Sequence, residues 1–297
     1  MTSANHQNPT TPTTPIQRVG VIGAGLMGRG IAQVSAQAGL AVVMIDVSDG
    51  ALQQGLAAIS GSLDRLVKKG KLGADDKAAA LARITLSTDY AGLADVDLVI
   101  ETATEHPDLK FKILRQVEAV VRKDTVIATN TSSISITQLA AVLQHPARFI
   151  GVHFFNPVPM MALVELIQGL QTSADTHALC LAYVLALGKT PITVKNAPGF
   201  VVNRILCPML NEAVFALQEG LASAEDIDIG MTLGCNHPIG PLALADLVGL
   251  DTLLAVMTVF YEGLNDPKYR PAPLLKEMVA AGWLGRKSGR GFYPYAV

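Results

Sequence analysis

Two patterns of apolar and polar residues, one strand-like and one helical, alternate along the first two thirds of this 297-residue chain. Short runs rich in Val and Ile suit strands buried on both faces, and they take turns with longer stretches whose apolar positions have helical spacing. This alternation predicts a mostly parallel sheet with crossover helices. The expected strands are 18–22, 41–45, 84–87, 98–100, 125–129, 148–152, 163–167 and 192–194.

Between the second and third expected strands, the pattern contains two helical stretches where an ordinary crossover has one. They cover residues 49–69 and 74–83, and Gly70–Gly73 joins them. We therefore expect a helical hairpin inserted into the sheet domain.

After residue 196 the helical spacing continues without a convincing strand. Helices are expected at 200–219, 224–233, 242–260 and 273–281, and Pro208 is expected to kink the first of them because proline lacks a backbone N–H. The chain is thus predicted to fold as an α/β domain at 16–196 followed by an all-helical domain at 197–297. Residues 1–15, rich in Thr and Pro, are expected to form a disordered tail rather than a signal peptide.

Charge and cysteine content narrow the classes of partner. A net charge of −2 with scattered Lys and Arg argues against nucleic acid and anionic membranes as partners. Cys180, Cys207 and Cys235 form no CxxC pair, so neither a disulfide framework nor a metal site is expected. The longest apolar run, 179–187, is too short to span a bilayer. We expect a cytoplasmic protein.

A glycine-rich motif follows the first strand and opens a helix. Gly23 permits a tight turn, Gly25 lets backbone amides approach a pyrophosphate, and Gly28 lets helix and strand pack closely. Asp46, at the end of the second strand, suits the adenine-ribose hydroxyls and repels a 2′-phosphate. A turn without function is the alternative, but strand, helix and acid stand where an NAD site requires them. The pattern predicts a Rossmann-type NAD-binding domain.

Polar residues also follow three later strands. Glu101 and Glu105 follow one strand, the NTSS segment at 130–133 the next, and His153 the one after. Ligands bind at the carboxyl ends of parallel strands, so these groups are expected to share one edge of the sheet. Each has a simpler explanation, because NTSS could cap a helix and His153 could be a core histidine. Their convergence favours a catalytic site.

The segment 151–166 carries the most specific chemistry. His153 and Glu165 lie in two strand-like runs, separated by a loop that contains Pro157 and Pro159. If the chain reverses there, the two side chains meet across neighbouring strands. A carboxylate beside an imidazole holds the ring in one tautomer, so this pair predicts a general base.

From Ile16 to Tyr295 the chain resembles the 3-hydroxyacyl-CoA dehydrogenase family, in particular its short monofunctional 3-hydroxybutyryl-CoA dehydrogenases. The matching motifs are GAGLMGRGIA at 23–32, ATNTSS at 128–133, GVHFFNPVP at 151–159, LVE at 163–165, PGFVVNR at 198–204, HPIGPLALADLVGLD at 237–251 and GRKSGRGFY at 285–293. One departure is Ala162, where members of the family often carry lysine.

This resemblance assigns four catalytic residues. It makes His153 the base and Glu165 its orienting partner. Ser132 matches the serine that hydrogen-bonds the substrate's 3-oxygen, and Asn203 matches an asparagine that helps to hold the reacting group.

The glycine motif and the resemblance together give two sets of expected ligand contacts, and no metal is expected. The expected cofactor contacts are Gly23, Gly25, Leu26, Met27, Gly28, Asp46, Glu105, Lys110, Asn130, Ser132, Asn156 and Lys287. The expected substrate contacts are Ser62, Lys69, Lys110, Ser132 and Asn203.

The activity implied is oxidation of an (S)-3-hydroxyacyl-CoA, in particular 3-hydroxybutanoyl-CoA, to the 3-oxoacyl-CoA by hydride transfer to NAD. The helical domain is expected to contribute to substrate binding and to a homodimer. Two alternatives stay open: a dehydrogenase of another CoA thioester, such as 3-hydroxyadipyl-CoA, or of a sugar acid, and a non-catalytic NAD-binding protein.

Overall fold

The computed structural model describes residues 15–296 of the chain. The tail predicted at 1–15 lies outside this range except for its last residue. The chain divides into two compact units between Asn196 and Ala197.

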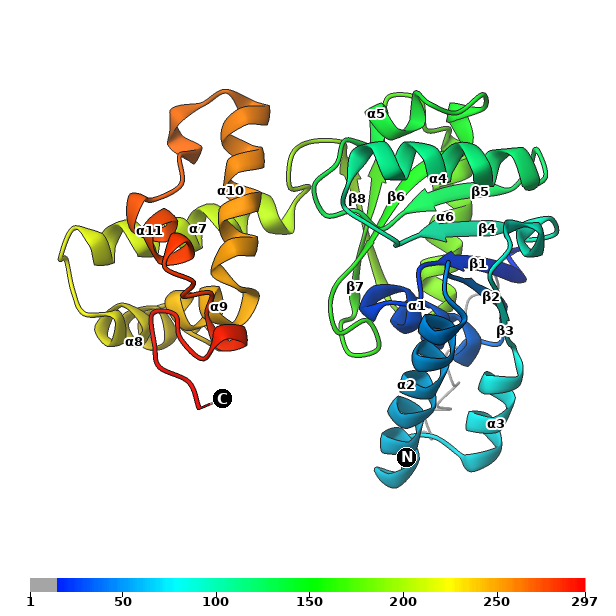
Figure 1. Ribbon diagram of the computed structural model, residues 1–297, viewed down its shortest axis with the longest axis horizontal. Helices are drawn as coiled ribbons and strands as arrows, with labels where there is room; N and C mark the ends of the chain where they lie inside the picture. The colour runs from blue at the N-terminus through cyan, green and yellow to red at the C-terminus, as the bar shows by residue number, and fades with distance from the viewer. Residues whose placement is uncertain (1–14, 297) are drawn as a thin grey trace, which may run out of the picture. The chain divides into compact units, whose positions relative to one another are not determined.

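The first unit is built on one eight-stranded sheet with the order β3-β2-β1-β4-β5-β6-β7-β8 (Figure 1). All neighbouring strands are parallel except β6 and β7, which form the antiparallel pair. The strands are β1 Arg18–Ile22, β2 Ala41–Ile45, β3 Ile84–Ser87, β4 Leu98–Glu101, β5 Val126–Thr129, β6 Phe149–Phe154, β7 Leu163–Gln168 and β8 Thr190–Lys195. The predicted mostly parallel sheet is confirmed.

Helices cover this sheet on both faces. The helices of the first unit are α1 Leu26–Gln37, α2 Asp49–Lys68, α3 Ala74–Ala82, α4 Pro107–Val120, α5 Ile136–Ala140 and α6 Ala174–Ala186, with 3₁₀ turns at Tyr90–Leu93 and Pro146–Arg148. Buried residues of α1, α2 and α6 form one cluster with every second residue of the strands. In Figure 1, α4 crosses in front of the strands and α6 lies behind them.

The inserted helical hairpin consists of α2 and α3, which lie side by side in Figure 1. Ser48 caps α2, because its hydroxyl accepts a hydrogen bond from the amide of Ala51 at 3.3 Å. Leu52, Ile59 and Leu63 recur at helical spacing and are buried in the cluster behind the sheet. This stripe holds one side of α2 against α1, and the other side stays available at the surface.

The second unit is helical, as predicted. It contains α7 Val202–Gln218, α8 Ala224–Gly234, α9 Pro241–Val248, α10 Leu250–Leu264 and α11 Pro273–Ala280, with 3₁₀ turns at Pro267–Tyr269 and Arg286–Ser288, around its own apolar core. Helix α7 continues through Pro208.

The single helix predicted at 242–260 is wrong. Two helices, α9 and α10, meet there at an angle of 96°. Gly249 lies between them with a φ of 101°, which residues with a Cβ rarely adopt. The apolar pattern runs on across the break because both helices bury their apolar residues in the same core.

Neither a membrane span nor a metal site is evident between residues 15 and 296. Within that range no single helix is both long and apolar enough to cross a bilayer, although α9 and α10 pass this test as a bent pair. The same part of the chain holds no group of three or more His, Cys, Asp or Glu residues arranged to bind a metal ion.

Candidate active site

His153 and Glu165 lie directly opposite each other on the antiparallel strands β6 and β7. Their neighbours Val152, Phe154 and Val164 belong to the cluster behind the sheet, so the alternation of side chains turns His153 and Glu165 to the other face. The Nδ1–H of His153 donates to the Glu165 carboxylate at 2.7 Å. Glu165 is fully buried and His153 is 5% exposed. The carboxylate therefore orients the ring and leaves Nε2 for chemistry.

Ser132 contacts that second ring nitrogen. Its hydroxyl lies 3.1 Å from Nε2 of His153. With Nδ1 as the donor to Glu165, Nε2 of the neutral ring is an acceptor, so the Ser132 hydroxyl donates. The triad Ser132–His153–Glu165 thus forms a single hydrogen-bonded chain that begins at a half-buried hydroxyl and ends in the protein interior.

Glu105 holds the segment that carries Ser132. One carboxylate oxygen accepts from the amide of Ser132 at 3.0 Å, and the other accepts from the hydroxyl of Thr131 at 2.6 Å. Asn130, in the same segment, accepts from the amide of Phe154 at 2.8 Å. The cap of the following helix is Ser135, outside the NTSS segment. The segment therefore links strands β5 and β6 instead of capping a helix.

A buried charged network lies beneath this edge of the sheet. Lys110 is 1% exposed, and its ammonium group donates to Glu101 at 2.5 Å and to Thr129 at 3.2 Å. Burial raises the pKa of the Tyr90 hydroxyl, and the nearby carboxylates of Glu101 and Asp46 raise it further. The sequence did not predict this pairing of Lys110, whose ligand contact remains a prediction.

The glycine loop has the shape that a pyrophosphate needs. Gly23 has a φ of 101°, and a Cβ added at Gly28 would overlap the carbonyl oxygen of Gly23. Above Gly25 there is open space, since an added Cβ meets no atom within 4 Å. Helix α1 begins at Leu26, and no side chain caps its N-terminus. The amides at this N-terminus can therefore donate hydrogen bonds to an anion.

The carboxylate of Asp46 lies against the glycine loop. It accepts from the amide of Ala24 at 2.8 Å. Leu26 is exposed and Met27 is half-buried at the start of α1. The residues present therefore fit a dinucleotide with its pyrophosphate on the helix N-terminus and a ribose at Asp46.

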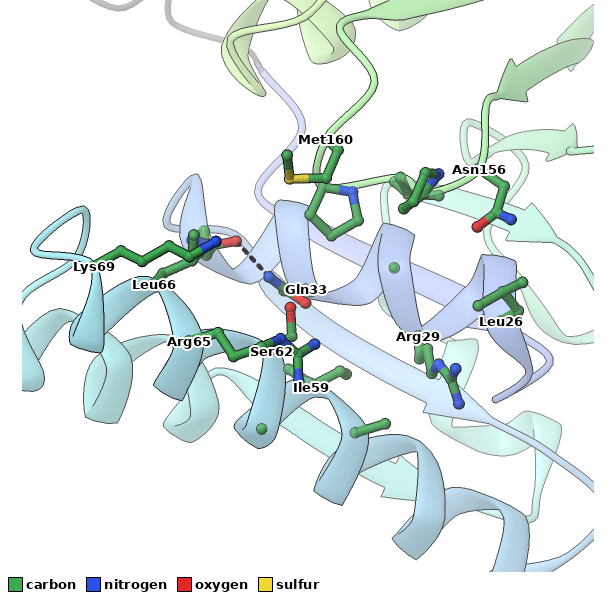
Figure 2. Close-up of a pocket in the computed structure, with 17 residues that line it drawn as sticks. Leu26, Arg29, Gln33, Ile59, Ser62, Arg65, Leu66, Lys69, Asn156 and Met160 are labelled. Carbon is green, nitrogen blue, oxygen red and sulfur yellow. Dashed lines mark hydrogen bonds between the residues drawn. The ribbon is translucent and has the colours of Figure 1, made fainter. Parts of the chain in front are cut away.

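A groove of about 630 Å³ runs between α1, α2 and the loop that joins β6 to β7. Figure 2 shows Ser62 and Arg65 on α2, and Lys69 directly after its end, across α1 from Asn156 and Met160 of that loop. Two of the predicted substrate contacts, Ser62 and Lys69, therefore line one cavity. Arg65 was missed, although its spacing of three and four residues from them places it on the same helix face.

Asn203 and Lys287 belong to the second unit. Asn203 is half-buried at the start of α7. Lys287 forms an ion pair with Asp251 at 2.5 Å. Their contacts with ligands stay predictions.

Comparison with known protein families covers both units. A family model described as the NAD-binding domain of 3-hydroxyacyl-CoA dehydrogenase matches residues 18–197. A second model, for the C-terminal domain of the same enzymes, matches residues 199–295.

Individual relatives match over nearly the whole chain. A curated 3-hydroxybutyryl-CoA dehydrogenase of Bradyrhizobium diazoefficiens is 52% identical over 280 residues, which cover 94% of this chain and 96% of that protein. A crystal structure of (S)-3-hydroxybutyryl-CoA dehydrogenase PaaH1 from Ralstonia eutropha is 65% identical, with a TM-score of 0.94, and the match covers 95% of this chain and 100% of that one. The structure of FadB2 from M. tuberculosis is 44% identical, with a TM-score of 0.91 and coverage of 95% and 99%.

Proposed function

Because the chain belongs to the 3-hydroxyacyl-CoA dehydrogenase family, we propose that it interconverts (S)-3-hydroxybutyryl-CoA and acetoacetyl-CoA with NAD as its cofactor. The observation that carries the proposal is the hydrogen-bonded chain from Ser132 through His153 to Glu165, in the same domain as the glycine loop. A protein that only bound the dinucleotide would not need a buried carboxylate to orient an imidazole.

His153 is the proton-transfer group in this proposal. In the oxidative direction its neutral Nε2 takes the proton of the 3-hydroxyl group, and Glu165 stabilises the resulting imidazolium through its bond to Nδ1. In the reductive direction the imidazolium returns the proton to the 3-oxygen. NAD, when bound, supplies the acceptor for the hydride that leaves C3. Ser132 orients the 3-oxygen beside Nε2, and Glu105 keeps Ser132 in place.

In this proposal the glycine loop and Asp46 bind the cofactor, and Asp46 sets the preference for NAD over NADP. Asp46→Ala is expected to shift the ratio of kcat/KM for NADH over NADPH by at least about tenfold toward NADPH, because the repulsion of a 2′-phosphate is lost. Steady-state kinetics with both cofactors measures this ratio. Asp75→Ala, which removes an exposed carboxylate from the first turn of α3, is the control and should leave the ratio unchanged. An unaltered ratio in the Asp46 variant would remove the ribose contact from the proposal.

The groove lined by Ser62 and Lys69 supports a CoA thioester over a free acid, because a cation and a hydroxyl suit the phosphates of a nucleotide. A substrate series tests this choice. In the reductive direction we expect acetoacetyl-CoA to have the highest kcat/KM, above longer 3-oxoacyl-CoA thioesters and 3-oxoadipyl-CoA, and at least about a hundredfold above free acetoacetate. In the oxidative direction, L-gulonate should be oxidised at least about a hundredfold less well than 3-hydroxybutyryl-CoA. A preference for a free acid would replace the CoA thioester in the proposal.

A homodimer in the cytoplasm completes the proposal. Apolar side chains are exposed on three helices of the second unit, namely Ile205 on α7, Ile229 and Leu233 on α8, and Leu247 on α9. Ile229 and Leu233 share one helix face, and a second copy of the chain would cover such residues. Light scattering is expected to give twice the chain mass, and a monomer at micromolar concentration would argue against the dimer. We place the protein in the cytoplasm, where CoA thioesters and NAD are both present.

A further inference from the structure

Lys189 is a buried cation that the proposed mechanism does not use. It is 8% exposed, and its ammonium group donates to the carbonyl oxygens of Val158 and Met161, each at 2.7 Å. It forms no ion pair with any carboxylate in residues 15–296. Burial lowers the pKa of Lys189, as expected for a charge removed from water. Burying an ammonium group without a carboxylate partner costs folding free energy, and this cost indicates that Lys189 has a function.

Both partners of Lys189 lie in the loop 155–162, which joins the two strands of the His153–Glu165 pair. The loop turns on itself through the carbonyl of Pro157, which accepts from the amides of Met160 and Met161. At the end of the loop, the amide of Thr190 donates to Ala162 at 2.8 Å. Lys189 is therefore next to the point where the loop meets strand β8.

Helix α1 bounds the loop on the opposite side. Val158 is 2% exposed and packs on Gly30, where an added Cβ would lie 2.8 Å from the Val158 side chain. Lys189 reaches the loop from the C-terminus of α6, where Gly188 turns the chain with a φ of 70°. The loop 155–162 therefore packs on α1 through Val158 and is hydrogen-bonded to Lys189 on its other side, and its position depends on both contacts.

The loop 155–162 forms a wall of the groove that contains Ser62 and Lys69. Its residues from Asn156 to Met160 line that groove, and Pro159 and Met160 also line a second hollow of about 640 Å³ on the side of Lys189. The loop thus separates two hollows, and its apolar contacts include Val158 on Gly30 and the ring of Phe155, which lies 4.7 Å from the ring of His153. The two hydrogen bonds from Lys189 hold the segment from Val158 to Met161 between these hollows.

We propose that Lys189 is a positioning residue for the CoA thioester: by binding the carbonyl oxygens of Val158 and Met161 it holds the loop 155–162 in the shape that completes the substrate groove. The inference rests on the proposed function in naming a CoA thioester as the ligand. Lys189 itself contacts neither substrate nor cofactor in this proposal. Its effect is on substrate affinity, because His153, Glu165 and Ser132 are held by the sheet and by Glu105.

Replacing Lys189 by Met keeps the length of the side chain and removes both hydrogen bonds. In the folded variant, the KM for acetoacetyl-CoA is expected to rise at least about tenfold while kcat stays within about threefold. Lys189→Arg, which retains charge and two donors, should recover most of the affinity. Lys195→Met, at the exposed far end of strand β8, is the matched control and should behave as the unaltered protein.

Hydrogen exchange of the peptide covering 155–162 gives a readout without turnover. The Met variant should exchange there at least about tenfold faster, with the rest of the sheet unaffected. An unchanged KM, or exchange that rises evenly over the whole first unit, would overturn the proposal and leave Lys189 a merely structural residue. If the Met variant does not fold, the same two measurements on Lys189→Gln decide.

Failure of the proposed function looks different. In that case the unaltered protein does not consume NADH with acetoacetyl-CoA, and the affinity for CoA itself, measured by calorimetry, replaces KM. Weaker CoA binding in the Met variant would then support the proposed positioning of the loop 155–162 by Lys189, and equal binding would overturn it.

Discussion

Replacing His153 by Gln is expected to lower kcat for acetoacetyl-CoA reduction by about 10²–10⁴-fold, the range that general acid–base assistance supplies. Glutamine cannot deliver a proton to the 3-oxygen, although it has nearly the volume of the imidazole and can donate to Glu165 as His153 does at 2.7 Å. The affinity for NADH, measured by fluorescence titration, should change less than about twofold, since the glycine loop and Asp46 are untouched.

A second histidine provides the control for this variant. His177 is hydrogen-bonded to Thr193 at 2.8 Å on the surface of the same unit. His177→Gln should leave kcat within about twofold of the unaltered protein. If His153→Gln were as active as this control, His153 would not be the proton-transfer group.

Replacing Gly25 by Val is expected to weaken NADH binding by at least about a hundredfold without unfolding the protein. The backbone at Gly25 has φ −67° and ψ −166°, an extended conformation open to any residue, and no atom lies within 4 Å of an added Cβ. The fold therefore tolerates a side chain there. That side chain would occupy the space that a pyrophosphate needs to reach the amides of α1.

Titration with NADH and a thermal melt separate the two effects. The melting temperature should shift by only a few degrees while the affinity collapses. Gly230→Ala on α8, where an added Cβ also meets no atom within 4 Å, is the control and should alter neither. Unchanged NADH affinity in Gly25→Val would show that the dinucleotide does not lie over this loop.

Much of the sheet could be predicted because buried parallel strands have a distinct composition. Strands β1, β2 and β3 have the predicted bounds; in β1 and β2 this is because runs of Val and Ile end at Gly23 and Asp46. Strand β8 is longer than predicted, and it includes Pro191. Proline is tolerated there because β8 is the last strand at one edge of the sheet. The position of a strand within the sheet is a tertiary property that local pattern does not contain.

The direction of helices was harder to predict than their presence. The apolar pattern of 242–260 is continuous, and only Gly249 separates α9 from α10. A glycine inside a helical pattern is compatible with an unbroken helix, so the 96° bend follows from packing rather than from the residues alone.

The contact of His153 with Glu165 was predictable because strand register and alternation follow from short-range pattern. Lys189 was not, since its partners are backbone carbonyls, which leave no signature in side-chain types. The pairing of Lys110 with Glu101 was missed because two charges nine residues apart give no sign of burial.

The central claim is that His153 and Glu165 act as one acid–base unit. Comparing kcat for His153→Gln, Glu165→Gln and the double variant tests it most directly. We expect Glu165→Gln alone to cost about tenfold to a hundredfold, and the double variant to be no more than about threefold slower than His153→Gln, because a carboxylate has nothing to orient once the imidazole is gone. Losses that multiply in the double variant would show that the two residues work independently and would contradict the account.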